Sequence, residues 1–311
     1  MTEDIAESDG LVILVGDGQS QQVSGDASLA RPVFSVTKMF VAAAALRLAE
    51  DGVLDLDHPA GRWLPDAPGM AGVAGVTTLR EILRHTAGLP DYARSPAYLA
   101  AVAARPGRPW GLERILDCAF SCEGGPAGQA GPAGGRAARG EFWYCNAGYW
   151  IAGAVLERAA GAPLGDVLGA LIFGPCGMTS TRYPAGHDGQ TADGYDTRWA
   201  GPAGAAWSTA ADLDLFLRAL VGGSLLAGPS LAMMTSPVPV PPQPPWRQPG
   251  YGLGLMVDSG RGLVGHGGEG PGYQAAAFIA PGQVRSAIVL ARSSAEVSAP
   301  ELAVAMIEQE T

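Results

Sequence analysis

The sequence predicts an α+β fold in which helices flank an antiparallel sheet built from both ends of the chain. A short apolar run at residues 11–16 is typical of a buried strand, helical patterns fill the middle, and three strand-like runs follow residue 250. Strands, then helices, then strands again favour this arrangement over a doubly wound sheet. We expect residues 1–57 and 200–311 to form the sheet region and residues 58–199 a mainly helical region, with the active site between them.

The first elements are predicted by apolar runs and the residues that interrupt them. Residues 11–16 precede an Asp-Gly turn, and a second strand is expected at residues 21–25. Residues 36–51 are rich in alanine and leucine, which predicts a helix, and Gly52 is suited to end it.

Helices and loops alternate through the rest of the chain. Residues 78–85 predict a helix with Thr77 or Thr78 as its N-cap, and residues 123–140 are rich in Gly, Ala and Pro, which predicts a surface loop. The remaining expected elements are helices at 146–160, 208–220 and 299–309, a proline-rich extended stretch at 236–250, and strands at 251–257, 274–279 and 286–290.

Composition excludes several classes of function. The 311 residues are 47% hydrophobic and 16% charged, which excludes a largely disordered chain. The formal net charge of −10 and the absence of basic runs argue against nucleic acid and against an anionic membrane surface as partners. Residues 1–7 are acidic and lack the features of a secretory signal, so we expect a cytoplasmic protein.

The metal-binding residue types are scattered. The four cysteines, Cys118, Cys122, Cys145 and Cys176, fit free thiols better than a disulfide framework. The four histidines form no His-x-x-x-His pair, and no Cys-x-x-Cys pair is present. We therefore expect no metal and no cofactor.

Ser35 and Lys38 are the first residues that indicate chemistry. Residues three apart on a helix share a face, so the lysine can take the proton of the serine hydroxyl if burial lowers its pKa. The backbone N–H groups at a helix N-terminus can stabilise an oxyanion. The structural alternative is a serine N-cap followed by a solvated lysine.

Two further motifs supply parts that this pair lacks. Tyr144 can relay a proton near a neutral lysine, and Asn146 can hold that lysine and a substrate amide together. The alternative for this motif is a packed aromatic cluster that enters a helix. The run His266-Gly267-Gly268-Glu269 allows a substrate carbonyl to approach backbone N–H groups, and its alternative is a plain hairpin turn.

Ser-x-x-Lys, Tyr-x-Asn and His-x-Gly occur in this order, which resembles the signature of the serine β-lactamase and penicillin-binding-protein superfamily. The chain is most similar to its class C β-lactamase-like branch, which contains esterases, D-aminopeptidases, D-alanyl-D-alanine carboxypeptidases and transacylases. Other segments that look like this branch are Thr78-Leu79-Arg80-Glu81-Ile82-Leu83-Arg84-His85-Thr86-Ala87-Gly88-Leu89-Pro90, Gly174-Pro175-Cys176-Gly177-Met178, Trp207-Ser208-Thr209-Ala210-Ala211-Asp212-Leu213 and Tyr251-Gly252-Leu253-Gly254.

The resemblance implies a β-lactamase/transpeptidase-like fold and assigns roles. Ser35 would be the acylated nucleophile, with Lys38 and Tyr144 as the proton-transfer pair. Asn146 would bind the lysine and the substrate. His266 would stand where true β-lactamases have a lysine. The oxyanion would bind the backbone N–H groups of Ser35 and Glu269, beside Gly267 and Gly268.

Two departures from the family pattern stand out. Position 269 usually carries a small residue, so Glu269 either recognises an amine of the substrate or acceptor, or points to solvent. Ser35 follows only 34 residues, so we expect the usual first helix to be missing or much shortened, which would leave the sheet covered by the C-terminal helix alone or by a partner subunit. The oligomeric state is not predicted. His85 and Tyr92 are interpreted as structural, and Cys145 is expected to pack inward.

Three functions fit these residues. The first is an esterase or amidohydrolase that acts on a small-molecule ester or amide through an acyl-enzyme. The second is a transacylase that passes the acyl group to an amine or alcohol acceptor in small-molecule biosynthesis. The third is a non-catalytic penicillin-binding-like protein.

Overall fold

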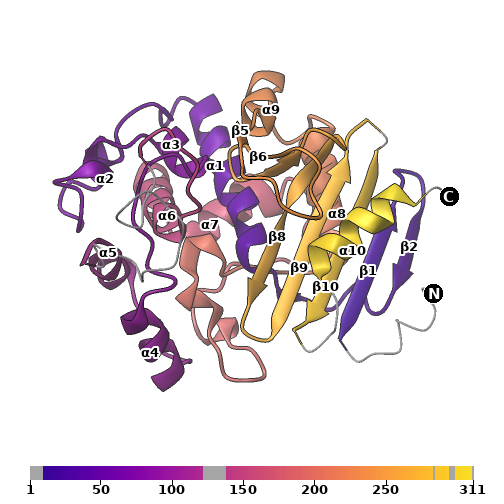
Figure 1. The fold of residues 1–311 in the computed structure, drawn as a ribbon, viewed down its shortest axis with the longest axis horizontal. Helices are drawn as coiled ribbons and strands as arrows, with labels where there is room; N and C mark the ends of the chain where they lie inside the picture. The colour runs from indigo at the N-terminus through magenta and orange to yellow at the C-terminus, as the bar shows by residue number, and fades with distance from the viewer. Residues whose placement is uncertain (1–9, 122–137, 283, 294–297, 310–311) are drawn as a thin grey trace.

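The computed structural model describes residues 10–121, 138–282, 284–293 and 298–309. An antiparallel sheet stands beside a group of helices (Figure 1). The strand order is β2-β1-β10-β9-β8-β7-β6-β5. The strands are β1 (Leu11–Gly16), β2 (Gln21–Ser24), β5 (Val238–Pro239), β6 (Pro249–Tyr251), β7 (Met256–Asp258), β8 (Leu263–Gly270), β9 (Tyr273–Ala280) and β10 (Arg285–Arg292).

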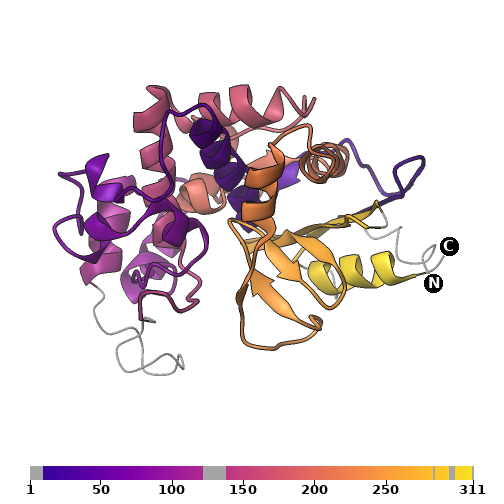
Figure 2. The ribbon, with the colours of Figure 1, turned by 90° about the horizontal axis from the view of Figure 1, so that it is seen from above.

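Strand β1 joins the first part of the chain to the last. It pairs with β10, so that Leu14 lies opposite Ile288. Side chains alternate along a strand, and both faces of β1 are apolar because helices cover both faces of the sheet. Helix α8 (Ala210–Val221) packs on one face and α10 (Ala299–Glu308) on the other (Figures 1 and 2). Because helices cover both faces, residues 11–16 form a continuous apolar run instead of an alternating one.

The helical side is organised around α1 (Thr37–Glu50), which is buried along most of its length and packs against α6 (Asn146–Ala160). The other α-helices are α2 (Val73–Val76), α3 (Leu79–Leu83), α4 (Pro96–Ala104), α5 (Leu112–Ser121), α7 (Leu164–Leu168) and α9 (Gly228–Thr235). Short turns of other helix types are η1 (Phe34–Val36), η2 (Ala60–Arg62), η3 (Gly169–Phe173), η4 (His187–Gly189), η5 (Thr197–Trp199) and η6 (Gly201–Ala203), and β3 (Arg31–Pro32) pairs with β4 (Trp207–Ser208). No helix in the described ranges has the length and apolar character needed to cross a bilayer.

The α+β class and the antiparallel sheet are confirmed, and two strand predictions differ from the structure. Strand β8 occupies residues where no strand was predicted and where a hairpin turn was one of two interpretations. The strand predicted at 251–257 is divided into the end of β6 and β7. Gly254 causes the break, because it has a φ of +67° and lies against the Lys38 carbonyl. Most of the loop predicted at 123–140 lies outside the described residues.

Candidate active site

Ser35 lies in η1, the turn that leads into α1. The preceding Phe34 has a φ of +43°, which L-residues rarely adopt. A hydrogen bond from the Val33 N–H to the Ala206 carbonyl (3.0 Å) fixes the entry to the turn. Backbone strain of this kind persists only where the surroundings hold it, and it is common at functional sites.

Lys38 is fully buried, and its Nζ has three partners. These are Ser35 Oγ at 3.1 Å, Asn146 Oδ1 at 2.9 Å and the Ala203 carbonyl at 2.8 Å. Burial lowers the pKa of Lys38 to about 7, against the opposing influence of Asp91 and Cys145. A large fraction of the amine is therefore neutral near pH 7 and able to accept a proton.

Tyr144 completes the group around the serine. Its ring centroid lies 4.8 Å from Lys38 Nζ, and its hydroxyl forms a hydrogen bond with Ser35. The residue exposes 37% of its surface, yet burial around the hydroxyl raises the pKa of Tyr144. The phenol therefore keeps its proton at neutral pH. It can act as a general acid toward a leaving group if a neighbouring group reprotonates it.

Asn146 is the first residue of α6, and its amide contacts two titratable side chains, Lys38 and Asp91. The amide oxygen accepts from Lys38, and Nδ2 donates to Asp91 Oδ2 at 3.2 Å. The expected contact between Asn146 and the lysine is present.

Both ring nitrogens of His266 are occupied within the protein. Nδ1 contacts the Gly267 carbonyl, and Nε2 lies 2.9 Å from the Tyr251 hydroxyl. A carbonyl only accepts, so Nδ1 carries the proton and Nε2 accepts from Tyr251. Burial, followed by the charge of Lys38, lowers the pKa of His266 to about 3. His266 is therefore a neutral imidazole, with no free ring nitrogen to offer a substrate.

Gly268 and Gly270 bring strand β8 close to the serine turn. A Cβ at position 268 would lie 2.1 Å from the Val33 carbonyl oxygen and 3.0 Å from Ser35 N, and one at 270 would overlap the Phe34 ring. Only glycine permits this approach. The backbone of β8 therefore runs beside the Ser35 N–H, as an oxyanion hole made of two backbone donors requires.

Replacing Gly268 with alanine is expected to separate η1 from β8, because the new methyl group meets backbone atoms that cannot rotate away. Overpacking of this kind costs roughly 1–3 kcal/mol of stability. We expect a lower melting temperature and a fall in kcat/KM of roughly 100-fold. Gly228→Ala is the matched control, because a Cβ at that position meets no atom within 4 Å. A wild-type kcat/KM in Gly268→Ala would show that catalysis does not depend on the close approach of β8 to η1.

The side chain of Glu269 points away from Ser35. Gly268 and Gly270 face the serine turn, whereas a Cβ at Gly267 would face Pro300 of α10. Side chains alternate along a strand, so Glu269 lies on the α10 face with Gly267, and it is exposed. Of the two predicted roles, the geometry favours a carboxylate that points to solvent over one that recognises an amine of the substrate.

Three residues near the site had no predicted chemical role. Tyr251 donates to His266, and Asp91 contacts the start of α6. His85 has a φ of +60°, accepts from the Cys145 N–H at 3.1 Å through Nδ1, and stacks 4.3 Å from the Tyr144 ring. The expectation that Cys145 packs inward is confirmed, because it is buried and contacts the Pro90 carbonyl. The sequence signal for His85 and Asp91 was the family-like segment that ends immediately before Asp91.

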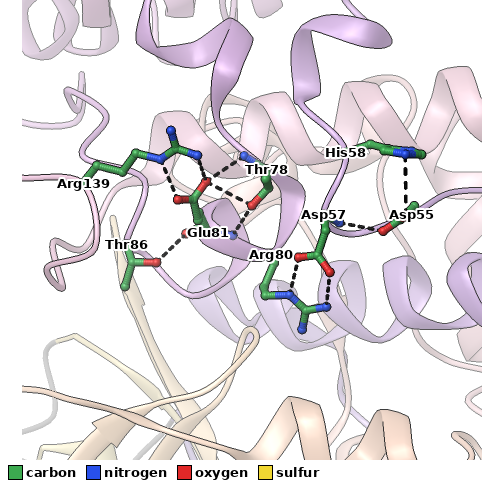
Figure 3. Close-up of polar contacts among 8 residues, drawn as sticks. All are labelled: Asp55, Asp57, His58, Thr78, Arg80, Glu81, Thr86 and Arg139. Atoms are coloured by element: carbon green, nitrogen blue, oxygen red, sulfur yellow. Dashed lines mark hydrogen bonds and ion pairs between the residues drawn. The ribbon is translucent and has the colours of Figure 1, made fainter.

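The segment that leads to Tyr144 is bonded to α3 and to the residues that follow it. The Arg139 guanidinium binds both oxygens of Glu81 at 2.6 and 2.8 Å, and Glu81 also caps α3 together with Thr78 (Figure 3). The Gly140 and Trp143 N–H groups donate to the carbonyls of Thr86 and His85, each at 2.8 Å. These bonds position Tyr144. The same view shows Arg80 bound to Asp57 through two hydrogen bonds.

The described residues contain no group of three or more His, Cys, Asp or Glu side chains placed to hold a metal ion.

Comparison with known proteins places this geometry among related folds. A family model described as Beta-lactamase matches residues 11–310. Esterase EstB of Burkholderia gladioli is 34% identical over 168 residues, which cover 50% of this chain and 41% of EstB. A D-aminopeptidase of Cereibacter sphaeroides (strain ATCC 17023) is 28% identical over an alignment 335 positions long, gaps included, which covers 97% of this chain and 60% of the relative. The chain thus spans less than two thirds of the length of these relatives.

A solved structure extends the comparison to the whole fold. The D-stereospecific amidohydrolase from Streptomyces sp. superposes with a TM-score of 0.78 at 26% sequence identity, and 93% of each chain is covered. The similarity therefore includes both the sheet and the helical side.

Proposed function

Because the chain belongs to the Beta-lactamase family, we propose that it is a serine hydrolase that forms an acyl-enzyme on Ser35 and hydrolyses a small-molecule ester or amide. The observation that carries the proposal is the buried Lys38 amine, 3.1 Å from Ser35 Oγ. A serine hydroxyl needs a base to become a nucleophile, and a desolvated lysine is one.

The reaction would proceed in two steps. Neutral Lys38 takes the Ser35 proton while Oγ bonds to the substrate carbonyl carbon. The negative charge moves to the carbonyl oxygen, which binds the backbone N–H groups of Ser35 and Glu269. Tyr144 gives its proton to the leaving oxygen or nitrogen and recovers one from Lys38. The bond to the leaving group breaks, and water then attacks the ester on Ser35 by the same proton path and releases the acid.

An acceptor other than water would make the same acyl-enzyme a transacylase. The names of the relatives cover an esterase and an aminopeptidase, so both ester and amide donors belong in the test. Partition of the acyl group between water and an added amine or alcohol distinguishes the two fates.

We expect incubation with an activated ester, stopped by acid within seconds, to raise the intact mass of the protein by the mass of the acyl group. Peptide mapping should place that group on Ser35. With an amine present, a hydrolase still gives mainly the acid, whereas a transacylase gives amide in proportion to the amine. If no adduct and no turnover are found with any activated ester, thioester, amide or β-lactam, the protein binds ligands without catalysis.

A further inference from the structure

Asp91 holds the start of α6 although it lies far from that helix in the sequence. Its Oδ1 accepts from the backbone N–H groups of Asn146 at 2.8 Å and Ala147 at 3.1 Å. Its Oδ2 accepts from Asn146 Nδ2 at 3.2 Å. The residue before the helix, Cys145, supplies no side-chain cap. Asp91 is therefore the capping group of α6, and its third contact is with the Asn146 side chain.

The third contact determines which way the Asn146 amide faces. All three partners of Asp91 donate, so both of its oxygens accept, as an ionised carboxylate does. A carboxylate beside an amide attracts Nδ2 and repels Oδ1. The amide oxygen is thereby turned toward Lys38 Nζ, which lies 2.9 Å from it.

The orientation of that oxygen decides where the lone pair of Lys38 points. A neutral amine has two N–H bonds and one lone pair. Asn146 Oδ1 and the Ala203 carbonyl can only accept, so they take the two N–H bonds. The lone pair is left for the third partner, Ser35 Oγ at 3.1 Å. We propose that Asp91 is a positioning residue that fixes the Asn146 amide and so aims the basic lone pair of Lys38 at Ser35. This inference rests on the acyl-enzyme proposed above.

Asp91 also acts on Lys38 through its charge. The Asp91 carboxylate opposes the effect of burial on Lys38 and keeps the pKa of that amine from falling further below its ordinary value. Among the described residues, the other groups that face Lys38 are the Ser35 hydroxyl and the titratable side chains of Tyr144, Tyr149, Cys145, His85 and His266. Neither histidine supplies a negative charge that could replace that of Asp91.

The test is Asp91→Asn in the full chain. Asparagine is a good N-cap, so its Oδ1 can still accept from the N–H groups of α6. Its NH₂ group would then face Asn146, turn that amide over, and present Nδ2 to Lys38. The amine would accept from Nδ2 and direct an N–H bond at Ser35. We expect the acylation rate to fall by roughly 100-fold, with the melting temperature nearly unchanged. Loss of the carboxylate should also move the acid limb of the pH–rate profile to lower pH.

Controls separate this role from capping and from the proposed function itself. Asp57→Asn removes an exposed carboxylate that binds Arg80, and it should leave the rate and the acid limb as in the wild type. Should Asp91→Asn fail to fold, Asp91→Ser keeps a capping oxygen without fixing the amide and is expected to lose rate in the same way.

Two results would overturn the inference. One is a wild-type acylation rate in the Asp91 variant. The other is a slower rate with an unmoved acid limb and a lower melting temperature, which would mean that Asp91 acts only as a cap. A wild-type enzyme that forms no adduct would instead refute the proposed function.

Discussion

Replacement of Ser35 by alanine is expected to abolish the acyl adduct and to lower kcat/KM by roughly 10⁴-fold or more. The variant loses the only atom in the proposed mechanism that bonds to the substrate carbonyl carbon, while the backbone donors of η1 and β8 remain. The Ser35 hydroxyl contacts Lys38 and Tyr144, which belong to the site itself, so the fold should be unaffected. Intact mass spectrometry after incubation with an activated ester measures the adduct directly.

The control for this substitution is Ser28→Ala, an exposed serine that binds Asp26. It should acylate as the wild type does. If the alanine variant at position 35 still gains the same mass, peptide mapping will identify the residue that carries the acyl group, and Ser35 will not be the nucleophile.

Lys38→Met is expected to lower the acylation rate by roughly 10³-fold, because methionine fills a similar volume but accepts no proton. Burial lowers the pKa of Lys38 to about 7, so wild-type kcat/KM should fall about tenfold for each pH unit below that value. The methionine variant should lack this acid limb. A limb that persists in Lys38→Met would assign the titration to another group.

The same depressed pKa predicts how stability changes with pH. Unfolded chains carry a lysine that stays protonated up to about pH 10.4, whereas the folded protein releases that proton near pH 7. In this window the unfolded state binds more protons, so the stability of the wild type should rise with pH relative to Lys38→Met. Melting temperatures of the two proteins between pH 7 and 10 measure the difference. A constant difference would mean that the buried amine keeps its proton.

The motif spacing predicted which residues meet around the serine. Ser35 lies in η1, three residues before Lys38 in α1, and Asn146 begins a helix whose predicted bounds agree with the structure. Motif spacing and helix signals in the sequence were therefore enough to predict these positions. They did not reach Asp91, because its partners lie more than 50 positions away and no local pattern marks a remote cap.

Strand β8 shows why part of the sheet was missed. Four of its eight residues are glycines, which disfavour strands in isolation. The strand forms because β9 pairs along it. Its glycines are required because side chains at Gly268 and Gly270 would collide with the serine turn. The direction of Glu269 and the tautomer of His266 depend on the same tertiary contacts.

The pairing of β1 with β10 has a consequence for biosynthesis. Strand β1, which precedes Ser35, leaves the ribosome long before its partner β10 and before β8. Pairings between distant segments form slowly, because a long loop must close before they contribute to stability. A nascent chain that already contains Ser35 therefore cannot complete the candidate site until β8 and β10 have been made. Catalytic competence and completion of the sheet should appear together in refolding experiments.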